Sequence, residues 1–181
     1  ACDDWQPGPG FTRWAWDADG LLGEAPLWGR FWENPSLPPE DRALMERFRD
    51  AAAAELARIG DTLDFGLIHA DLVGENILAD GDRLHLIDFD DGGYGYRLFD
   101  LATALIKTIE EPDHATLRAA LCEGYLSERK IDLAPLDLFL AVRAVTYLGW
   151  IVPRMGEPGA KARNTRFLRT SRLLVSEWID S

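Results

Sequence analysis

The chain has 181 residues and a formal charge of −12, with three lysines and sixteen arginines. A chain of this length buries roughly 70% of its unfolded surface, so it can form one domain with a substantial core. The negative charge argues against nucleic acid or an anionic membrane as the main partner, because both select basic surfaces. Without a signal-peptide pattern or an apolar run long enough to span a membrane, we expect a soluble, cytoplasmic protein.

Residues 1–38 are rich in Gly, Pro and Trp, and they contain five of the seven tryptophans. This composition predicts an irregular lead-in segment that is held in place by large aromatic side chains. We expect these rings to pack over a helical body; a docking surface for a missing domain is the alternative. Cys2 and Cys122 have no metal or redox spacing, so we interpret both as ordinary reduced thiols.

A helix is predicted from Pro38 or Pro39 to Ile59, because proline and two acidic residues open it and Gly60 follows it. Apolar residues recur along one face of this helix at a helical spacing, which indicates a core stripe rather than a binding face. The stripe consists of Leu44, Phe48, Ala52, Leu56 and Ile59.

The stretch from Leu67 to Asp91 carries the chemistry. It predicts a strand at 67–69, a polar loop at 70–75, and a hairpin with arms 76–79 and 84–87 around an Asp-Gly turn. The loop and the hairpin bring Asp71, Asn76 and Asp88 together. Asn76 and Asp88 are the type of oxygen ligands that Mg²⁺ takes beside substrate phosphates, which leaves Asp71 as a base. Taken singly, each residue is also compatible with a turn or a strand end.

The remainder of the chain is predicted to be mostly helical. Residues 90–96 form a glycine-rich run that we expect to be flexible, and a proline at 153 predicts a kink or stop in the third of the helices that follow. Apolar residues keep a helical period in these helices, including Leu117, Leu121 and Tyr125, and predict that they build the core. The predicted helices are 97–110, 113–128, 135–155 and 159–179.

The motif His69-Ala70-Asp71-Leu72-Val73-Gly74-Glu75-Asn76, followed by Ile87-Asp88-Phe89-Asp90, resembles a pair of motifs from one superfamily. That superfamily contains the aminoglycoside phosphotransferases, choline kinases and type II homoserine kinases, which share the protein-kinase fold. The resemblance implies that Asp71 is the catalytic base, that Asn76 and Asp88 bind magnesium at the nucleotide, and that His69 braces the loop. Asp100 matches a structural position that ties the loop to the next helix.

The resemblance implies an α+β, mainly helical fold. Residues 39–181 would be the C-terminal catalytic lobe of a kinase-like phosphotransferase, with a small β-hairpin at the catalytic loop. The implied reaction uses ATP and Mg²⁺ and transfers the γ-phosphate to a hydroxyl of a small molecule. The sequence departs from the family at Ala70, where glycine is common, and at Val73-Gly74-Glu75, where His-Pro-Gly is frequent. The candidate substrate contacts are Glu75, Asp90, Asp91, Tyr147, Trp150, Arg154 and Arg163. For the last four, packing or a solvated position at the surface is the alternative role.

Kinases of this type need a lysine and a loop of backbone amides on the nucleotide phosphates. The first lysine here is Lys107, and no G-x-G-x-x-G precedes His69. We therefore expect an N-terminal nucleotide lobe to be missing and the isolated chain to be inactive. Three alternatives stay open: a non-catalytic kinase-like binding module, a protein Ser/Thr kinase of the same superfamily, and a phosphatase with a D-x-D motif at Asp88. The phosphatase ranks last, because Gly92 stands where that motif takes threonine or valine.

Overall fold

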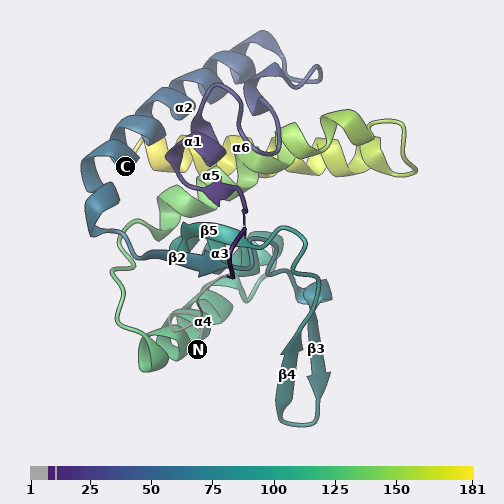
Figure 1. The fold of residues 1–181 in the computed structure, drawn as a ribbon. Coiled ribbons are helices and arrows are strands. Elements are labelled where there is room, and N and C mark those ends of the chain that lie inside the picture. The colour runs from purple at the N-terminus through teal and green to yellow at the C-terminus, as the bar shows by residue number, and fades with distance from the viewer. Residues whose placement is uncertain (1–7, 11) are drawn as a thin grey trace. The chain divides into compact units, whose positions relative to one another are not determined.

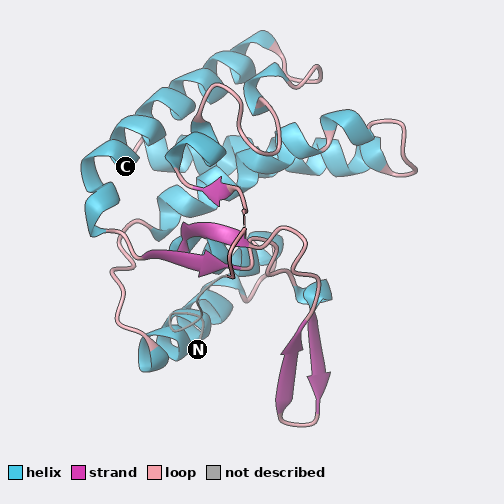
Figure 2. Ribbon diagram, in the orientation of Figure 1, coloured by secondary structure: helices cyan, strands magenta, loops and turns pink. Residues whose placement is uncertain are grey.

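The computed structural model describes residues 8–10 and 12–181 (Figure 1). The chain forms two compact units, each built from two separate segments. Unit 1 comprises Ala1–Asp17 and Leu63–Leu136, and unit 2 comprises Ala18–Thr62 and Asp137–Ser181. The predicted division near residue 38 does not coincide with a boundary of either unit. Most of the described chain is helical (Figure 2), and the α+β, mainly helical fold class is confirmed.

Unit 2 is built from helices. Helix α2 packs against α1 and α6, and its buried apolar residues are Met45, Phe48, Ala52 and Leu56. The helix has the predicted extent, but the stripe begins at Met45 rather than Leu44, and Ile59 is only half-buried. The elements of this unit are α1 (Ala18–Leu22), α2 (Pro39–Ile59), α5 (Leu136–Trp150) and α6 (Ala160–Ile179), with 3-10 turns at Phe31–Glu33, Gly60–Thr62 and Val152–Arg154.

The lead-in segment is more regular than predicted. It contains strand β1 (Ala15–Trp16), helix α1 and a 3-10 turn. The expectation that its aromatic rings pack inward holds for Trp16, which is 1% exposed and stacks on Phe99 with ring centroids 5.5 Å apart. It also holds for Trp32, which is buried against Phe31. Trp14 is exposed, and Cys2 and Trp5 lie outside the described residues.

Unit 1 contains a three-stranded sheet in the order β1-β5-β2. Strand β5 (Gly93–Tyr96) runs parallel to β1 and antiparallel to β2 (Phe65–Ile68). The prediction of a flexible glycine-rich run is therefore wrong for residues 93–96, which form the central strand. A Cβ atom on Gly95 would lie 2.5 Å from Ile68 Cδ1 and 2.7 Å from Trp16 Cβ. Glycine is needed here because neighbouring side chains approach the backbone closely.

The predicted hairpin is present in unit 1. Strands β3 (Ile77–Asp80) and β4 (Arg83–Leu86) pair in an antiparallel register and project away from the sheet (Figure 1). The turn consists of Gly81 and Asp82 rather than Asp-Gly, and Gly81 has a φ of 58°. Glycine adopts this left-handed conformation without the steric cost that a side chain would bring.

The helices of unit 1 follow the sheet. Helix α3 (Arg97–Leu105) is mostly buried and continues into a 3-10 turn at Ile106–Thr108. Helix α4 (His114–Glu128) has no buried residue, so the prediction that its apolar period builds the core is wrong. Leu117 of this helix is 40% exposed. By contrast, Leu138, Val142 and Val145 of α5, which also keep a helical period, are buried, and this helix ends at Trp150, before Pro153, as expected.

No helix among residues 8–10 and 12–181 combines the length and the apolar character that crossing a membrane requires.

A cluster of ionic contacts joins Asp64, just before β2, to Arg97 at the start of α3 and to Arg129 just after α4. The Asp64 carboxylate accepts hydrogen bonds from Arg129 Nη2 at 3.0 Å and from Arg97 Nε at 3.3 Å. It also pairs with Arg129 Nε. These contacts lower the pKa of Asp64 below its usual value of 3.8, chiefly through the hydrogen bond from Arg129. Folding therefore stabilises the ionised form of the Asp64 carboxylate relative to its protonated form.

We predict that Asp64→Asn lowers the free energy of unfolding by about 1–3 kcal/mol at neutral pH, because two guanidinium groups lose a charged acceptor. Because folding depresses the Asp64 pKa, its contribution is complete above pH 3.8 and disappears as the pH falls through the folded-state value. Urea unfolding of wild type and variant between pH 7 and pH 2.5 measures this. The exposed neighbour Asp61→Asn is the control, and an equal loss in both variants contradicts the prediction.

Candidate active site

The two central residues of the motif are in direct contact. The Asn76 side-chain amide donates from Nδ2 to the Asp71 carboxylate Oδ2 at 3.0 Å and to the Asp71 backbone carbonyl at 2.9 Å. A 3-10 turn at Gly74–Asn76 brings the asparagine back over the loop. Asn76 is 8% exposed, whereas Asp71 is half-exposed. The predicted meeting of these two side chains is thus present, and it fixes the orientation of a carboxylate that solvent can reach.

His69 links the same loop to the end of the hairpin. Its Nε2 lies 2.9 Å from the Ile87 carbonyl oxygen, and the Asp71 backbone amide donates to its Nδ1 at 3.3 Å. Both contacts are satisfied when the ring proton is on Nε2. The imidazole also lies 4.5 Å from the Phe89 ring, centroid to centroid. The buried histidine therefore has a bracing geometry, with its donor and its acceptor both engaged.

Asp100 of α3 holds the start of the loop. Its two carboxylate oxygens accept hydrogen bonds from the backbone amides of His69 at 2.8 Å and Ala70 at 2.7 Å. Ala70 is fully buried and has a φ of 64°. This left-handed conformation favours glycine, which gives a physical reason for the glycine that is common here in the family. The two charge-assisted hydrogen bonds offset the strain that alanine brings.

Asp88 lies at the other side of the site. The Ile87 backbone amide donates to the Asn76 carbonyl at 3.0 Å, so β4 ends beside the asparagine. Asp88 follows at once, is exposed, and has a φ of 62°. Aspartate tolerates this conformation better than most residues, and strained backbone of this kind concentrates at functional sites. The backbone of the hairpin end thus lies beside Asn76, and the meeting of the Asp88 side chain with those of Asp71 and Asn76 stays a prediction.

Three residues of the lead-in segment that were not predicted as site residues hold the stretch after Asp88. Arg13 Nη1 donates to the Asp90 carbonyl at 3.0 Å, and Trp16 Nε1 donates to the Asp91 carbonyl at 2.8 Å. Trp14 Nε1 also reaches the Asp91 carbonyl at 3.4 Å. The acceptors are backbone oxygens about 75 residues away, which have no signature in the sequence. The aromatic content of the segment was the only available signal.

The candidate substrate contacts fall into two groups. Glu75 pairs with Lys107 at 2.5 Å in unit 1, and Asp90 and Asp91 follow the hairpin in the same unit. Trp150 and Arg154 belong to unit 2, where both line a cavity. No group of three or more His, Cys, Asp or Glu side chains suited to a metal ion occurs within the described parts of the chain.

Residues 6–139 match the sequence model of a family described as the phosphotransferase enzyme family. The chain belongs to this family. Among curated relatives, a homoserine kinase from Rhizobium meliloti is 30% identical over 168 residues, which cover 86% of this chain and 50% of the relative. The family membership confirms the resemblance that the two motifs carry.

Solved structures of kinases have the same fold. A microcompartment-associated aminopropanol kinase superposes with a TM-score of 0.86 and 28% identity, covering 99% of this chain and 57% of that protein. The amicoumacin kinase hAmiN, in complex with AMP-PNP, Ca²⁺ and Ami, gives a TM-score of 0.67 at 21% identity, covering 97% and 54%. The chain spans about half the length of the proteins it matches.

We predict that Asp100→Asn loosens the loop before it affects the rest of unit 1. An amide offers one acceptor oxygen in place of two, so one buried backbone N–H loses its partner at a cost of about 1–3 kcal/mol. Hydrogen exchange monitored by NMR should show faster exchange at the amides of His69 and Ala70, with smaller changes in β5. The exposed Asp113→Asn serves as the control. Unchanged exchange at both loop amides in Asp100→Asn contradicts the assignment.

Proposed function

We propose that this chain carries the catalytic half of a phosphotransferase that moves the γ-phosphate of ATP to a hydroxyl of a small molecule. The observation that supports this most directly is the Asn76 amide held against the Asp71 carboxylate, beside the strand end that leads to Asp88. Phosphoryl transfer depends mostly on positioning and electrostatic stabilisation. A rigid loop with one oriented carboxylate and two further oxygen-bearing side chains meets that need.

Asp71 is the base in this proposal. Its carboxylate accepts the proton of the acceptor hydroxyl as the new O–P bond forms and the bond between the γ-phosphorus and the bridging oxygen breaks, releasing ADP. The hydrogen bond from Asn76 fixes one carboxylate oxygen. His69 and Asp100 keep the backbone of the loop in place through the contacts with Ile87 and with the two loop amides. A base positioned in this way contributes about 10²–10⁴-fold to the rate.

Asn76 and Asp88 fit a magnesium ion. The Asn76 Nδ2 group is turned to Asp71, and no described residue donates a hydrogen bond to its Oδ1. The oxygen is therefore available as a ligand, and Asp88 adds an exposed carboxylate at the end of the neighbouring strand. Magnesium usually takes one or two protein oxygens and completes its shell with phosphates and water. When bound, the ion neutralises charge on the transferring phosphate.

The names of related proteins support an alcohol as the acceptor. The matched proteins include kinases of homoserine, aminopropanol and amicoumacin. The hAmiN complex contains an ATP analogue and a divalent cation, which supports a nucleotide and a metal as co-reactants here. A non-catalytic kinase-like module is the second candidate, favoured by the ion pair between Lys107 and Glu75, which engages one of the candidate substrate contacts.

We predict that Asp71→Asn abolishes turnover while nucleotide binding stays within about twofold. The test uses a protein that joins this chain to a nucleotide-binding lobe. The amide cannot accept the hydroxyl proton, so the rate should fall by about 10²–10⁴-fold or more. Coupled ADP release measures the rate, and calorimetry with AMP-PNP measures binding. Asp82→Asn in the hairpin turn is the control. A wild-type rate in Asp71→Asn contradicts the role of the base, whereas no turnover in the joined protein without the substitution favours the non-catalytic module.

We also predict that Asp88→Ala in the same protein raises the magnesium concentration needed for half-maximal rate by at least about tenfold. Loss of one of two protein ligands weakens the metal site, while the phosphates still hold the ion in part. The rate is measured at saturating ATP across a magnesium titration. Asp80→Ala, on the adjoining strand, should leave the titration unchanged. An identical magnesium requirement in Asp88→Ala and wild type removes this residue from the metal site.

A further inference from the structure

Unit 2 contains a cavity of about 670 Å³. It lies between the segment around Trp28 and the C-terminal end of α5, where Trp150 and Arg154 line it. Small-molecule sites in proteins typically have volumes of about 300–1,000 Å³ and combine aromatic walls with a few polar groups. The cavity therefore has the size of a site for a small ligand.

The aromatic walls of the cavity are fixed by packing. A Cβ atom on Gly149 would lie 2.4 Å from the Gly29 carbonyl oxygen and 2.5 Å from that of Trp28, so α5 and the 28–29 segment touch through their backbones. The guanidinium of Arg143 is fully buried and lies 4.5 Å from the centroid of the Trp28 ring. It also lies 4.4 Å from the ring of Tyr147. Trp28 is thus held by a cation–π contact on its side away from solvent.

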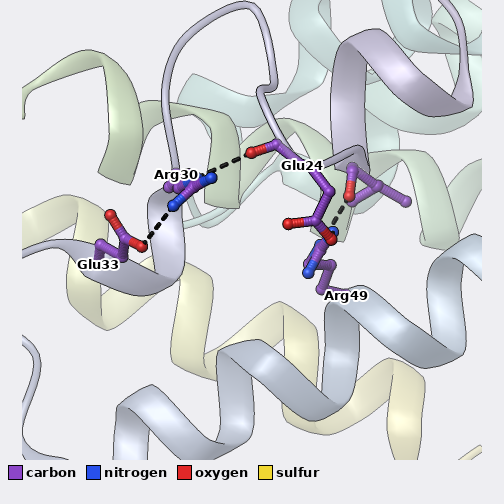
Figure 3. A network of polar contacts seen from close by, with 5 residues as sticks. Glu24, Arg30, Glu33 and Arg49 are labelled. Atoms are coloured by element: carbon purple, nitrogen blue, oxygen red, sulfur yellow. Dashed lines mark hydrogen bonds and ion pairs between the residues drawn. The ribbon is translucent and has the colours of Figure 1, made fainter.

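Two of the lining residues are arginines held in defined orientations. Arg30 donates from Nε to the Glu24 carbonyl at 2.8 Å and pairs with Glu33 at 3.1 Å (Figure 3). The guanidinium carbon of Arg154 lies 4.2 Å from the centroid of the Trp150 ring, and its Nη1 donates to the Trp150 carbonyl at 2.8 Å. Within the described residues Arg154 has no carboxylate partner. Its Nε and Nη2 groups keep their hydrogen-bonding capacity.

The sign of the charge around the cavity is opposite to that of the chain. Arg30 and Arg154 contribute two positive charges and Glu33 one negative charge, which leaves the lining at +1. The whole chain carries −12. A guanidinium group is a planar fork of N–H donors that matches the geometry of a carboxylate or a phosphate. Because no described carboxylate neutralises Arg154, this guanidinium would repel a cationic ligand. The lining therefore favours an anion.

We propose that this cavity binds a small molecule that carries an anionic oxygen group, a carboxylate or a phosphate, next to an apolar or planar part. The oxyanion is placed against Arg154 and Arg30, and the apolar part lies against the rings of Trp28 and Trp150. This site belongs to unit 2 and goes beyond the phosphoryl transfer proposed for the loop of unit 1. Binding is measured without turnover, so a failure of either proposal is distinguishable from a failure of the other.

The test uses four probes that share a phenyl ring and differ in the polar group. These are 3-phenylpropionate, phenyl phosphate, 2-phenylethanol and 2-phenylethylamine. They are titrated into the full 181-residue chain, and the indole N–H signals of Trp28 and Trp150 are followed by NMR after assignment with Trp28→Phe and Trp150→Phe. We expect at least one anionic probe to shift both signals and to bind about tenfold more tightly than the alcohol. Response to only one of the two anions identifies carboxylate or phosphate as the group recognised.

The charge is tested with matched variants. Arg154→Gln should weaken binding of the anionic probe by about tenfold and leave the alcohol unchanged, and Arg30→Gln should weaken it by a smaller factor. Glu33→Gln should tighten anion binding by a few-fold. Arg47→Gln, which removes an exposed arginine of α2 outside the lining, is the control, and thermal unfolding confirms that each variant is folded. No shift of either indole with both anions, tighter binding of the amine, or an equal loss in Arg47→Gln overturns the proposal.

Discussion

The Asp100 carboxylate is the constraint on which the candidate active site depends. A loop that must present both Asp71 and Asn76 turns sharply at Ala70, where the backbone is left-handed and the residue is not glycine. Such a conformation costs about 1–3 kcal/mol, and it persists only where the surrounding structure holds it in place. The two carboxylate oxygens of Asp100 do so by accepting consecutive backbone amides at the turn. Every later contact of the loop, including the one between Asn76 and Asp71, starts from this anchored turn.

The stretch that follows Asp88 is held from a distant part of the chain. Arg13 and Trp16 donate to backbone carbonyls of residues 90 and 91, while β1 lies alongside β5. Trp16 also stacks on Phe99, which neighbours Asp100 in α3. The lead-in segment therefore holds the backbone of residues 90 and 91, while α3 holds the backbone of residues 69 and 70 through Asp100. Removing the segment would expose Phe99 and release the carbonyls after Asp88, although no proposed catalytic residue lies within it.

Sequence reasoning succeeded where the signal is local. The extent of α2 and the meeting of Asp71 with Asn76 follow from capping residues, helical period and a five-residue spacing within one turn of chain. It failed where the deciding partner is distant. Gly95 resembles a flexible residue until Ile68 and Trp16 are known to occupy the space of its missing side chain. The apolar period of α4 likewise indicates a tendency to be buried, but its contact with α3 leaves none of its residues buried.

Charge shows the same difference between local and global properties. The chain carries −12 in total, yet the lining of the cavity in unit 2 is positive. Charges on the surface are screened over about 8–10 Å at physiological ionic strength, whereas a guanidinium that contacts a ligand acts at about 3 Å in a partly desolvated site. The net charge therefore governs solubility and long-range steering. The few groups that touch a ligand decide whether an anion or a cation is bound. An acidic chain can accordingly select an anion when two oriented arginines outnumber the carboxylates at the point of contact.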